Sequence, residues 1–188
     1  MNKRTSTDST AARPGRHLTA AFRNWLALLL LAAWLPSVAA QDAVLPPPTG
    51  EVLLEIHGAE RVTSGHDHAR LDARLLASLP RYERRTHTSV TDGPQQFSGY
   101  RLLDVLELVK ARGQRLRASA LNAYAVELDV AELERYEVLL ADHMNGQPLQ
   151  SGDKGPFWLI YPRDQYSELQ DIRYDYRWVW QLIRLEML

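Results

Sequence analysis

Histidines beside an acidic residue are the first candidates for chemistry in this sequence. His66 and His68 flank Asp67, and imidazole nitrogens suit zinc and copper. The two histidines are two positions apart in a segment that we expect to be a loop, and the sequence points to no third ligand. We therefore expect a solvated loop and no metal site.

Three further histidines, His57, His87 and His143, stand alone in the sequence. General acid–base catalysis needs a positioned side chain within reach of the proton that it moves. Nothing in the spacing supplies such a constellation, so we expect hydrogen-bonded structural histidines and assign no catalytic residue.

A charged, tyrosine-rich connection spans residues 163–175. Long irregular connections often carry binding residues. Basic side chains that can accept an anionic group are Lys154, Arg163, Arg173 and Arg177. Acidic side chains that can neutralise them are Asp164, Glu168, Asp171 and Asp175. An anion site and a solvated surface loop both remain open.

Aromatic residues are dense between positions 157 and 180. They are Trp158, Tyr161, Tyr166, Tyr174, Tyr176, Trp178 and Trp180. If residues 178–187 form one strand, Trp178 and Trp180 share a face opposite the aliphatic residues. That face then meets a covering helix, a partner protein or a flat ligand, and we favour packing over recognition.

The chain contains no cysteine. Disulfides, cysteine nucleophiles and thiolate metal sites are therefore excluded, and stability has to come from packing.

The N-terminal 40 residues are expected to be a cleavable secretory signal. Basic residues precede an apolar run of 11 residues, 25–35, and Val38, Ala39 and Ala40 supply the small residues before a cleavage site at Gln41. A membrane anchor is the alternative, but spanning takes about 20 apolar residues. A Pro-rich linker, 41–50, and one domain, 51–188, follow, with a periplasmic location and no later membrane span.

Charge argues against two classes of partner. The first 40 residues hold five basic and one acidic residue, so 17 of the 22 basic and 22 of the 23 acidic residues remain in the mature chain. An acidic chain has no electrostatic reason to bind nucleic acid or anionic lipid.

Strand and helix patterns interleave along the domain without a regular repeat. Apolar or alternating runs predict strands at 52–56, 61–63, 82–90, 115–120, 124–128, 138–141, 157–161 and 178–187. Spacings of three and four predict helices over 71–79 with Asp67 as its cap, over 102–109 stopping at Gly113, and over 129–136. Asn145-Gly146 predicts a hairpin. The pattern indicates an α+β fold with a mixed sheet and about three short helices.

Five segments resemble the oxidoreductase molybdopterin-binding domain family, the central fold of sulfite oxidases and their bacterial relatives. They are residues 97–106, 121–124, 144–149, 153–162 and 177–182. The resemblance implies an α+β domain of the sulfite-oxidase molybdopterin-binding type.

This chain differs from the family at the positions that bind the metal in catalytic members. In catalytic members, as the resemblance implies, a cysteine thiolate after the strand equivalent to 82–90 binds molybdenum. This chain offers Thr86, His87, Thr88 and Ser89 there, and Trp158 stands where the family often has a basic residue. Family enzymes load their cofactor in the cytoplasm and cross the membrane folded, whereas no twin-arginine pair precedes Trp25.

We therefore expect an exported, non-catalytic binding or accessory module with no cofactor. Its partner would be a small anionic or flat ligand, or a membrane-associated protein that receives a signal. The alternative is a molybdopterin-dependent oxidoreductase with an atypical metal site, since the resemblance makes molybdopterin possible. Candidate ligand-binding residues are His87, Asn122, Tyr124, Lys154, Trp158, Arg163 and Arg177.

Overall fold

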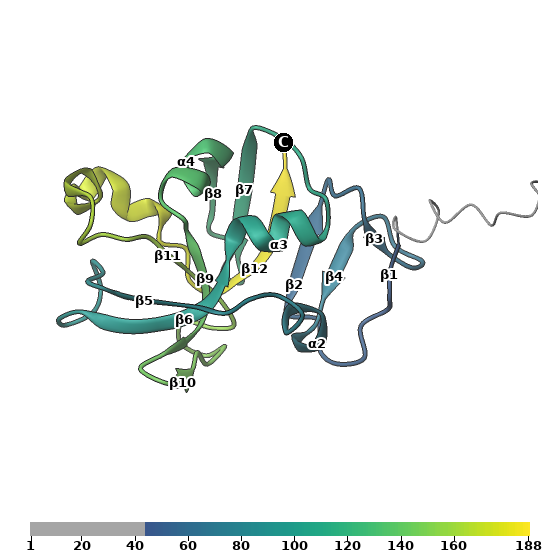
Figure 1. Ribbon diagram of the computed structural model, residues 1–188, viewed down its shortest axis with the longest axis horizontal. Coiled ribbons are helices and arrows are strands. Elements are labelled where there is room, and N and C mark those ends of the chain that lie inside the picture. The colour runs from purple at the N-terminus through teal and green to yellow at the C-terminus, as the bar shows by residue number, and fades with distance from the viewer. Residues whose placement is uncertain (1–43) are drawn as a thin grey trace, which may run out of the picture. The chain divides into compact units, whose positions relative to one another are not determined.

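Side chains alternate between buried and exposed positions in the first of the two five-stranded sheets. In a computed structural model that describes residues 44–188 (Figure 1), five strands pair in the order β4-β2-β12-β7-β8. Their bounds are β2 Leu54–His57, β4 Ala69–Leu71, β7 Arg115–Ala120, β8 Ala125–Asp129 and β12 Leu182–Met187. Leu54 and Ile56 are buried while Glu55 and His57 face outward, as the two-residue period of a strand requires.

The second sheet also has five strands, arranged around β9. Its path is β10-β9-β6-β5, and β11 also pairs with β9. The bounds are β5 Tyr82–Thr86, β6 Gln95–Arg101, β9 Leu139–Met144, β10 Gln147–Pro148 and β11 Trp158–Ile160. Two residues of β1, Val44–Leu45, pair with β3, Val62–Thr63. Leu45 is buried, so the fold includes part of the stretch expected to be a linker.

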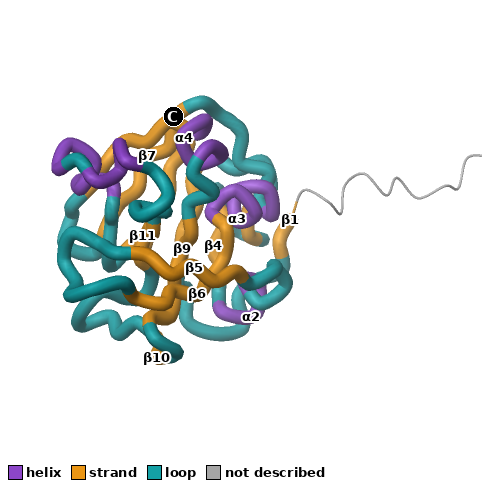
Figure 2. The backbone as a smooth tube through the Cα atoms, turned by 60° about the vertical axis from the view of Figure 1, so that its left-hand side comes forward, coloured by secondary structure: helices purple, strands orange, loops and turns teal. Residues whose placement is uncertain are grey.

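The helices are short, and strands and loops make up most of the fold (Figure 2). They are α2 Ala73–Leu76, α3 Leu102–Leu108 and α4 Val130–Arg135, with two 3-10 helices, η3 Ser167–Gln170 and η4 Ile172–Arg177. The mixed sheets and few short helices confirm the α+β fold class. The expected signal peptide lies outside the described residues, and within 44–188 no helix is long and apolar enough to cross a membrane.

Two helix boundaries differ from the sequence prediction. The helix expected over 71–79 is only α2, because Leu71 pairs with Leu54 in β4 and β2. Its cap is Asp72, not Asp67. The helix α3 buries Leu102, Val105 and Leu106 as predicted but ends before Gly113, because Lys110 already takes a positive φ of 52°.

The strand predicted over 178–187 begins only at Leu182. Gln181 has φ 53°, and its N–H donates to the Lys154 carbonyl oxygen at 2.9 Å, so the extended conformation cannot run through it. The prediction that Trp178 and Trp180 share one strand face is therefore wrong. Trp178 is 3% exposed and Trp180 is 37% exposed.

Asp72 ties the start of the fold to α2, and this gives a testable prediction. Its carboxylate accepts the backbone N–H of Leu75 at 2.9 Å and that of Thr49 at 2.7 Å. The Leu75 bond, with those of Thr49 and Gly50, lowers the pKa of Asp72 to about 2. We expect Asp72→Ala to lower the free energy of unfolding by about 2 kcal/mol at pH 7, measured by urea unfolding.

The pH dependence has a defined sign. Because folding lowers the pKa of Asp72 from 3.8, its stabilisation is fully present above about pH 4 and is lost as the pH falls through about 2. The difference between wild type and Asp72→Ala should therefore shrink below pH 4. The exposed Asp92, changed to alanine, is the control and should cost nothing measurable. An equal cost for Asp72→Ala at pH 7 and pH 2.5 would contradict the assignment.

Candidate functional site

An aromatic pocket lies between the β7–β8 turn and the 3-10 helix η4. Its volume is about 190 Å³, and its lining residues are Ala120, Asn122, Tyr124, Asp175, Tyr176, Trp178 and Trp180. Four of these seven residues are aromatic, and apolar concave surfaces with few polar groups are typical of small-molecule sites.

The first wall is a tight turn with backbone hydrogen bonds within itself and one to a neighbouring loop, from the Leu121 N–H to the Gln181 carbonyl oxygen at 2.9 Å. Ala120 donates its N–H to the Tyr124 carbonyl oxygen at 2.8 Å, and Ala123 takes a positive φ of 67°. The Asn122 side-chain oxygen accepts the Tyr124 N–H at 3.0 Å. Among the described residues the Asn122 amide Nδ2 has no hydrogen-bond partner, so it is a donor that a bound molecule can use.

The second wall is the C-terminal part of η4. Asp171 begins this helix by accepting the Arg173 N–H at 2.9 Å. The Tyr124 hydroxyl donates to the Tyr176 carbonyl oxygen at 2.8 Å and so joins the two walls. Burial, with a smaller effect from Tyr176, raises the pKa of Tyr124, so the phenol stays protonated at neutral pH and keeps this bond.

Trp158 supports the pocket from the core. It is fully buried, and its indole N–H donates to the Trp178 carbonyl oxygen at 3.2 Å. Its ring packs edge-on against Trp180, with 6.2 Å between ring centroids. Trp158 thus positions two lining residues without lining the pocket itself.

The structure brings together only two of the seven residues expected to bind a ligand. Asn122 and Tyr124 line the pocket, whereas the others do not: His87, Lys154, Trp158, Arg163 and Arg177. His87 pairs instead with Asp164, with 3.0 Å between Nδ1 and the carboxylate. The lining residues Tyr176, Trp178 and Trp180 were visible in the sequence only as part of the aromatic cluster. Nothing in the sequence indicated that Ala120 lines a pocket, and Asp175 was noted only as an acid that can neutralise nearby basic residues.

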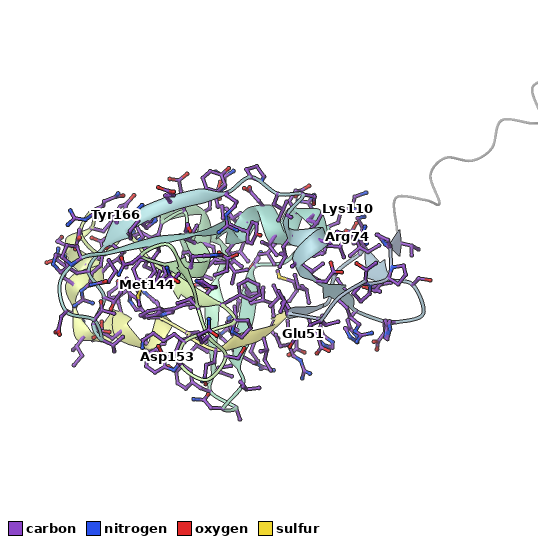
Figure 3. All side chains as sticks on the ribbon, turned by 90° about the horizontal axis from the view of Figure 1, so that it is seen from below. Glu51, Arg74, Lys110, Met144, Asp153 and Tyr166 are labelled. Atoms are coloured by element: carbon purple, nitrogen blue, oxygen red, sulfur yellow. The ribbon has the colours of Figure 1, made fainter. Side chains whose placement is uncertain are left out.

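Each of the four cations near the 163–175 connection has an acidic partner. The pairs are Lys154–Asp153 at 2.8 Å, Arg163–Asp175 at 2.7 Å, Arg173–Asp171 at 2.8 Å and Arg177–Glu132 at 3.2 Å. Asp153, beside Lys154, is exposed at the edge of the molecule (Figure 3). Each of these four basic side chains is therefore neutralised by an acidic side chain of the same chain, and none of the four is left unpaired for an anion.

The Arg177–Glu132 pair is largely buried. Burial raises the pKa of Glu132 above its ordinary value, against the opposing effect of the Arg177 guanidinium. Arg177 also stacks over Tyr174, with 4.2 Å from the guanidinium carbon to the ring centroid. The ion pair links η4 to α4, and the stack on Tyr174 lies within η4, so Arg177 has a structural role beside the pocket.

The residues at the expected metal position do not fit a thiolate-bound molybdenum. Thr86 and Thr88 are both buried at the end of β5. The Thr86 hydroxyl donates to the His87 carbonyl oxygen at 3.3 Å, and the Thr88 hydroxyl is 2.8 Å from that of Thr91. These oxygens are engaged within the chain, and neutral hydroxyls do not replace a soft anionic sulfur.

Comparison with known proteins supports the fold. No model of a known protein family matches the chain, and no curated protein matches its sequence. Among solved structures, the sulfane dehydrogenase SoxCD from Paracoccus pantotrophus is similar, with a TM-score of 0.53 and 17% identity over 72% of this chain.

At this identity the likeness concerns the fold alone, and this chain spans 37% of the length of the SoxCD chain. The match agrees with the α+β fold that the resemblance of the five segments implies. The described residues thus form an α+β domain whose fold is similar to part of the SoxCD chain. This domain has an aromatic pocket, and the chain has no thiol.

Proposed function

We propose that this chain is an exported, non-catalytic binding module whose aromatic pocket holds a small flat ligand in the periplasm. The observation that carries the proposal is the pocket itself, which four aromatic side chains line on a scaffold without a thiol ligand. Stacking on aromatic rings favours flat molecules.

The pocket's polar groups restrict the ligand further. Asp175 is paired with Arg163 at 2.7 Å, so the pocket offers little net charge. The Asn122 amide donor calls for a hydrogen-bond acceptor on the ligand. A neutral heteroaromatic molecule meets both conditions better than an anion does.

A protein partner is the second candidate, because the rim of the pocket is exposed and apolar. Tyr124, Tyr176 and Trp180 are 44%, 45% and 37% exposed, and aromatic residues dominate binding energy at protein interfaces. In this case a membrane-associated partner would insert a side chain where the small ligand would otherwise bind.

The direct test is a ligand screen with a pocket variant. We expect at least one neutral heteroaromatic compound, in a panel that includes free pterin, to raise the melting temperature of the wild type. Trp180→Ala should weaken binding of that compound at least about fivefold, since it removes one stacking surface worth about 1 kcal/mol or more. Ile172, which is 81% exposed and outside the pocket, supplies the control Ile172→Ala with unchanged binding.

Two results would overturn this proposal. If no compound stabilises the chain, or if Trp180→Ala binds as well as the wild type, the pocket is not a small-ligand site. If the natively exported protein carries stoichiometric molybdenum and its denatured form releases fluorescent oxidised pterin, the alternative of a molybdopterin-dependent oxidoreductase replaces it.

A further inference from the structure

Two histidines and a glutamate meet on the outward face of the β4-β2 edge of the first sheet. Glu55 and His57 are two positions apart in β2 and share a face. In the antiparallel register Ile56 faces Ala69, so His68, one position before β4, lies opposite His57. Figure 1 shows β2 and β4 side by side. His57, which stands alone in the sequence and was expected to be a hydrogen-bonded structural residue, thus lies beside a second histidine and a glutamate.

The three side chains converge at short range. His57 Nε2 is 3.9 Å from one carboxylate oxygen of Glu55, and His68 Nε2 is 3.8 Å from the other. All three potential ligand atoms lie within 4.8 Å of one another. The imidazole rings stack, with 4.5 Å between centroids and 16° between planes.

The imidazole nitrogens that face this group lack partners. Nε2 of His57 and Nε2 of His68 are both buried and have no hydrogen-bond partner among the described residues. Buried polar atoms are nearly always hydrogen-bonded. Two such atoms side by side, next to a carboxylate, indicate that a bound cation completes the site.

Neighbouring residues orient the ligands. The carboxylate of Asp67 accepts a hydrogen bond from Nδ1–H of His68 at 2.8 Å. A proton on Nδ1 leaves the Nε2 lone pair available, which is how carboxylates orient metal-binding histidines. Arg184 donates to Glu55 Oε2 at 2.9 Å and leaves Oε1 toward His68.

We propose that Glu55, His57 and His68 bind one Zn²⁺ ion. Two imidazole nitrogens and one carboxylate oxygen form a zinc ligand set that needs no sulfur, with water at the fourth position. Ligand atoms about 2.0–2.2 Å from a tetrahedral zinc ion lie about 3.3–3.5 Å apart. With Glu55 Oε1 as the ligand, its 3.8 Å separation from His68 Nε2 has to close by about 0.4 Å, and the separations from His57 Nε2, which are within 4.8 Å, have to close as its side chain turns toward the ion. Mg²⁺ and Ca²⁺ prefer all-oxygen sites and should not bind here.

The ion would clamp the edge strand β4 to β2, because His68 directly precedes β4 and the other two ligands are in β2. The site shares no residue with the aromatic pocket. The zinc proposal can therefore be tested independently of the proposed ligand-binding function.

Calorimetric titration of the purified chain with ZnCl₂ tests the proposal. We expect one Zn²⁺ per chain and no heat of binding with MgCl₂. His57→Ala and His68→Ala should each weaken zinc binding at least tenfold, whereas His143→Ala, which removes a histidine paired with Asp142, should leave it unchanged. Equal affinity in all four proteins, or no zinc binding by the wild type, overturns the proposal.

A measurement on the wild type alone covers the case in which a histidine variant does not fold. One equivalent of Zn²⁺ should shift the imidazole NMR signals of His57 and His68 and leave those of His87 and His143 in place. Shifts at His87 or His143 without shifts at His57 and His68 would place the ion elsewhere and overturn the assignment.

Discussion

Trp158→Ala is expected to lower the free energy of unfolding by about 3–5 kcal/mol, the usual cost of deleting a buried tryptophan side chain. Trp158 is fully buried in β11 and packs edge-on against Phe97, with 5.4 Å between ring centroids. The substitution leaves a cavity, and it also leaves the Trp178 carbonyl oxygen without its indole donor at 3.2 Å. Urea unfolding followed by circular dichroism measures the loss as a lower midpoint.

Two other variants make this result specific. Trp158→Phe keeps an aromatic ring and should cost clearly less than Trp158→Ala. Trp180→Ala removes a ring that is 37% exposed and should cost about 1 kcal/mol or less. If Trp158→Ala instead unfolded like the wild type and lost only ligand binding, the sequence-based assignment of Trp158 to the ligand would be right and its place in the core would be wrong.

Gly99→Ala is expected to destabilise the fold by about 3 kcal/mol or more, beyond the usual range for overpacking. Gly99 lies in β6 beside a register shift in its pairing with β9. A Cβ atom added there would overlap the Leu140 carbonyl oxygen and lie 2.7 Å from Ala141 Cα. Both are backbone atoms of a paired strand, so neither can move aside as a flexible side chain would.

The matched control is Gly152→Ala, because a Cβ atom at Gly152 meets nothing within 4 Å. Thermal and urea unfolding of both variants should show a large loss for Gly99→Ala and a negligible change for Gly152→Ala. Similar small effects in the two would mean that β6 and β9 do not approach as closely as the structure has them. The large loss would also explain physically why the segment 97–101 carries glycine in its middle.

The aromatic pocket and the absence of a thiol show that this fold and the chemistry of its sites have to be considered separately. A fold can host many unrelated functions, and the site decides which one applies. Here Thr86 and Thr88 bond within the chain, while Asn122, Tyr124 and Trp180 line a cavity on the same scaffold. These observations support our proposal that the pocket binds a ligand, which the ligand screen with Trp180→Ala tests.

Local features of the sequence determined much of the fold. Asn145 and Gly146 have φ of 52° and 77°, values that asparagine and glycine tolerate best. The hairpin was therefore predictable from these two residues alone. The helix at 102–108 followed from its apolar spacing. The absence of cysteine was by itself enough to exclude a thiolate site, because no other side chain supplies that ligand.

Only the tertiary structure decided which distant residues meet. Leu71 has the spacing of a helix but pairs with Leu54, and Trp178 and Trp180 lie outside strand β12 because Gln181 takes a positive φ just before the strand begins. The pocket joins Tyr124 to Tyr176, which are 52 positions apart, and His57 meets His68 across two strands. Strand pairing and side-chain burial depend on residues far apart in the sequence, and the spacing of nearby residues does not predict which of them will be in contact.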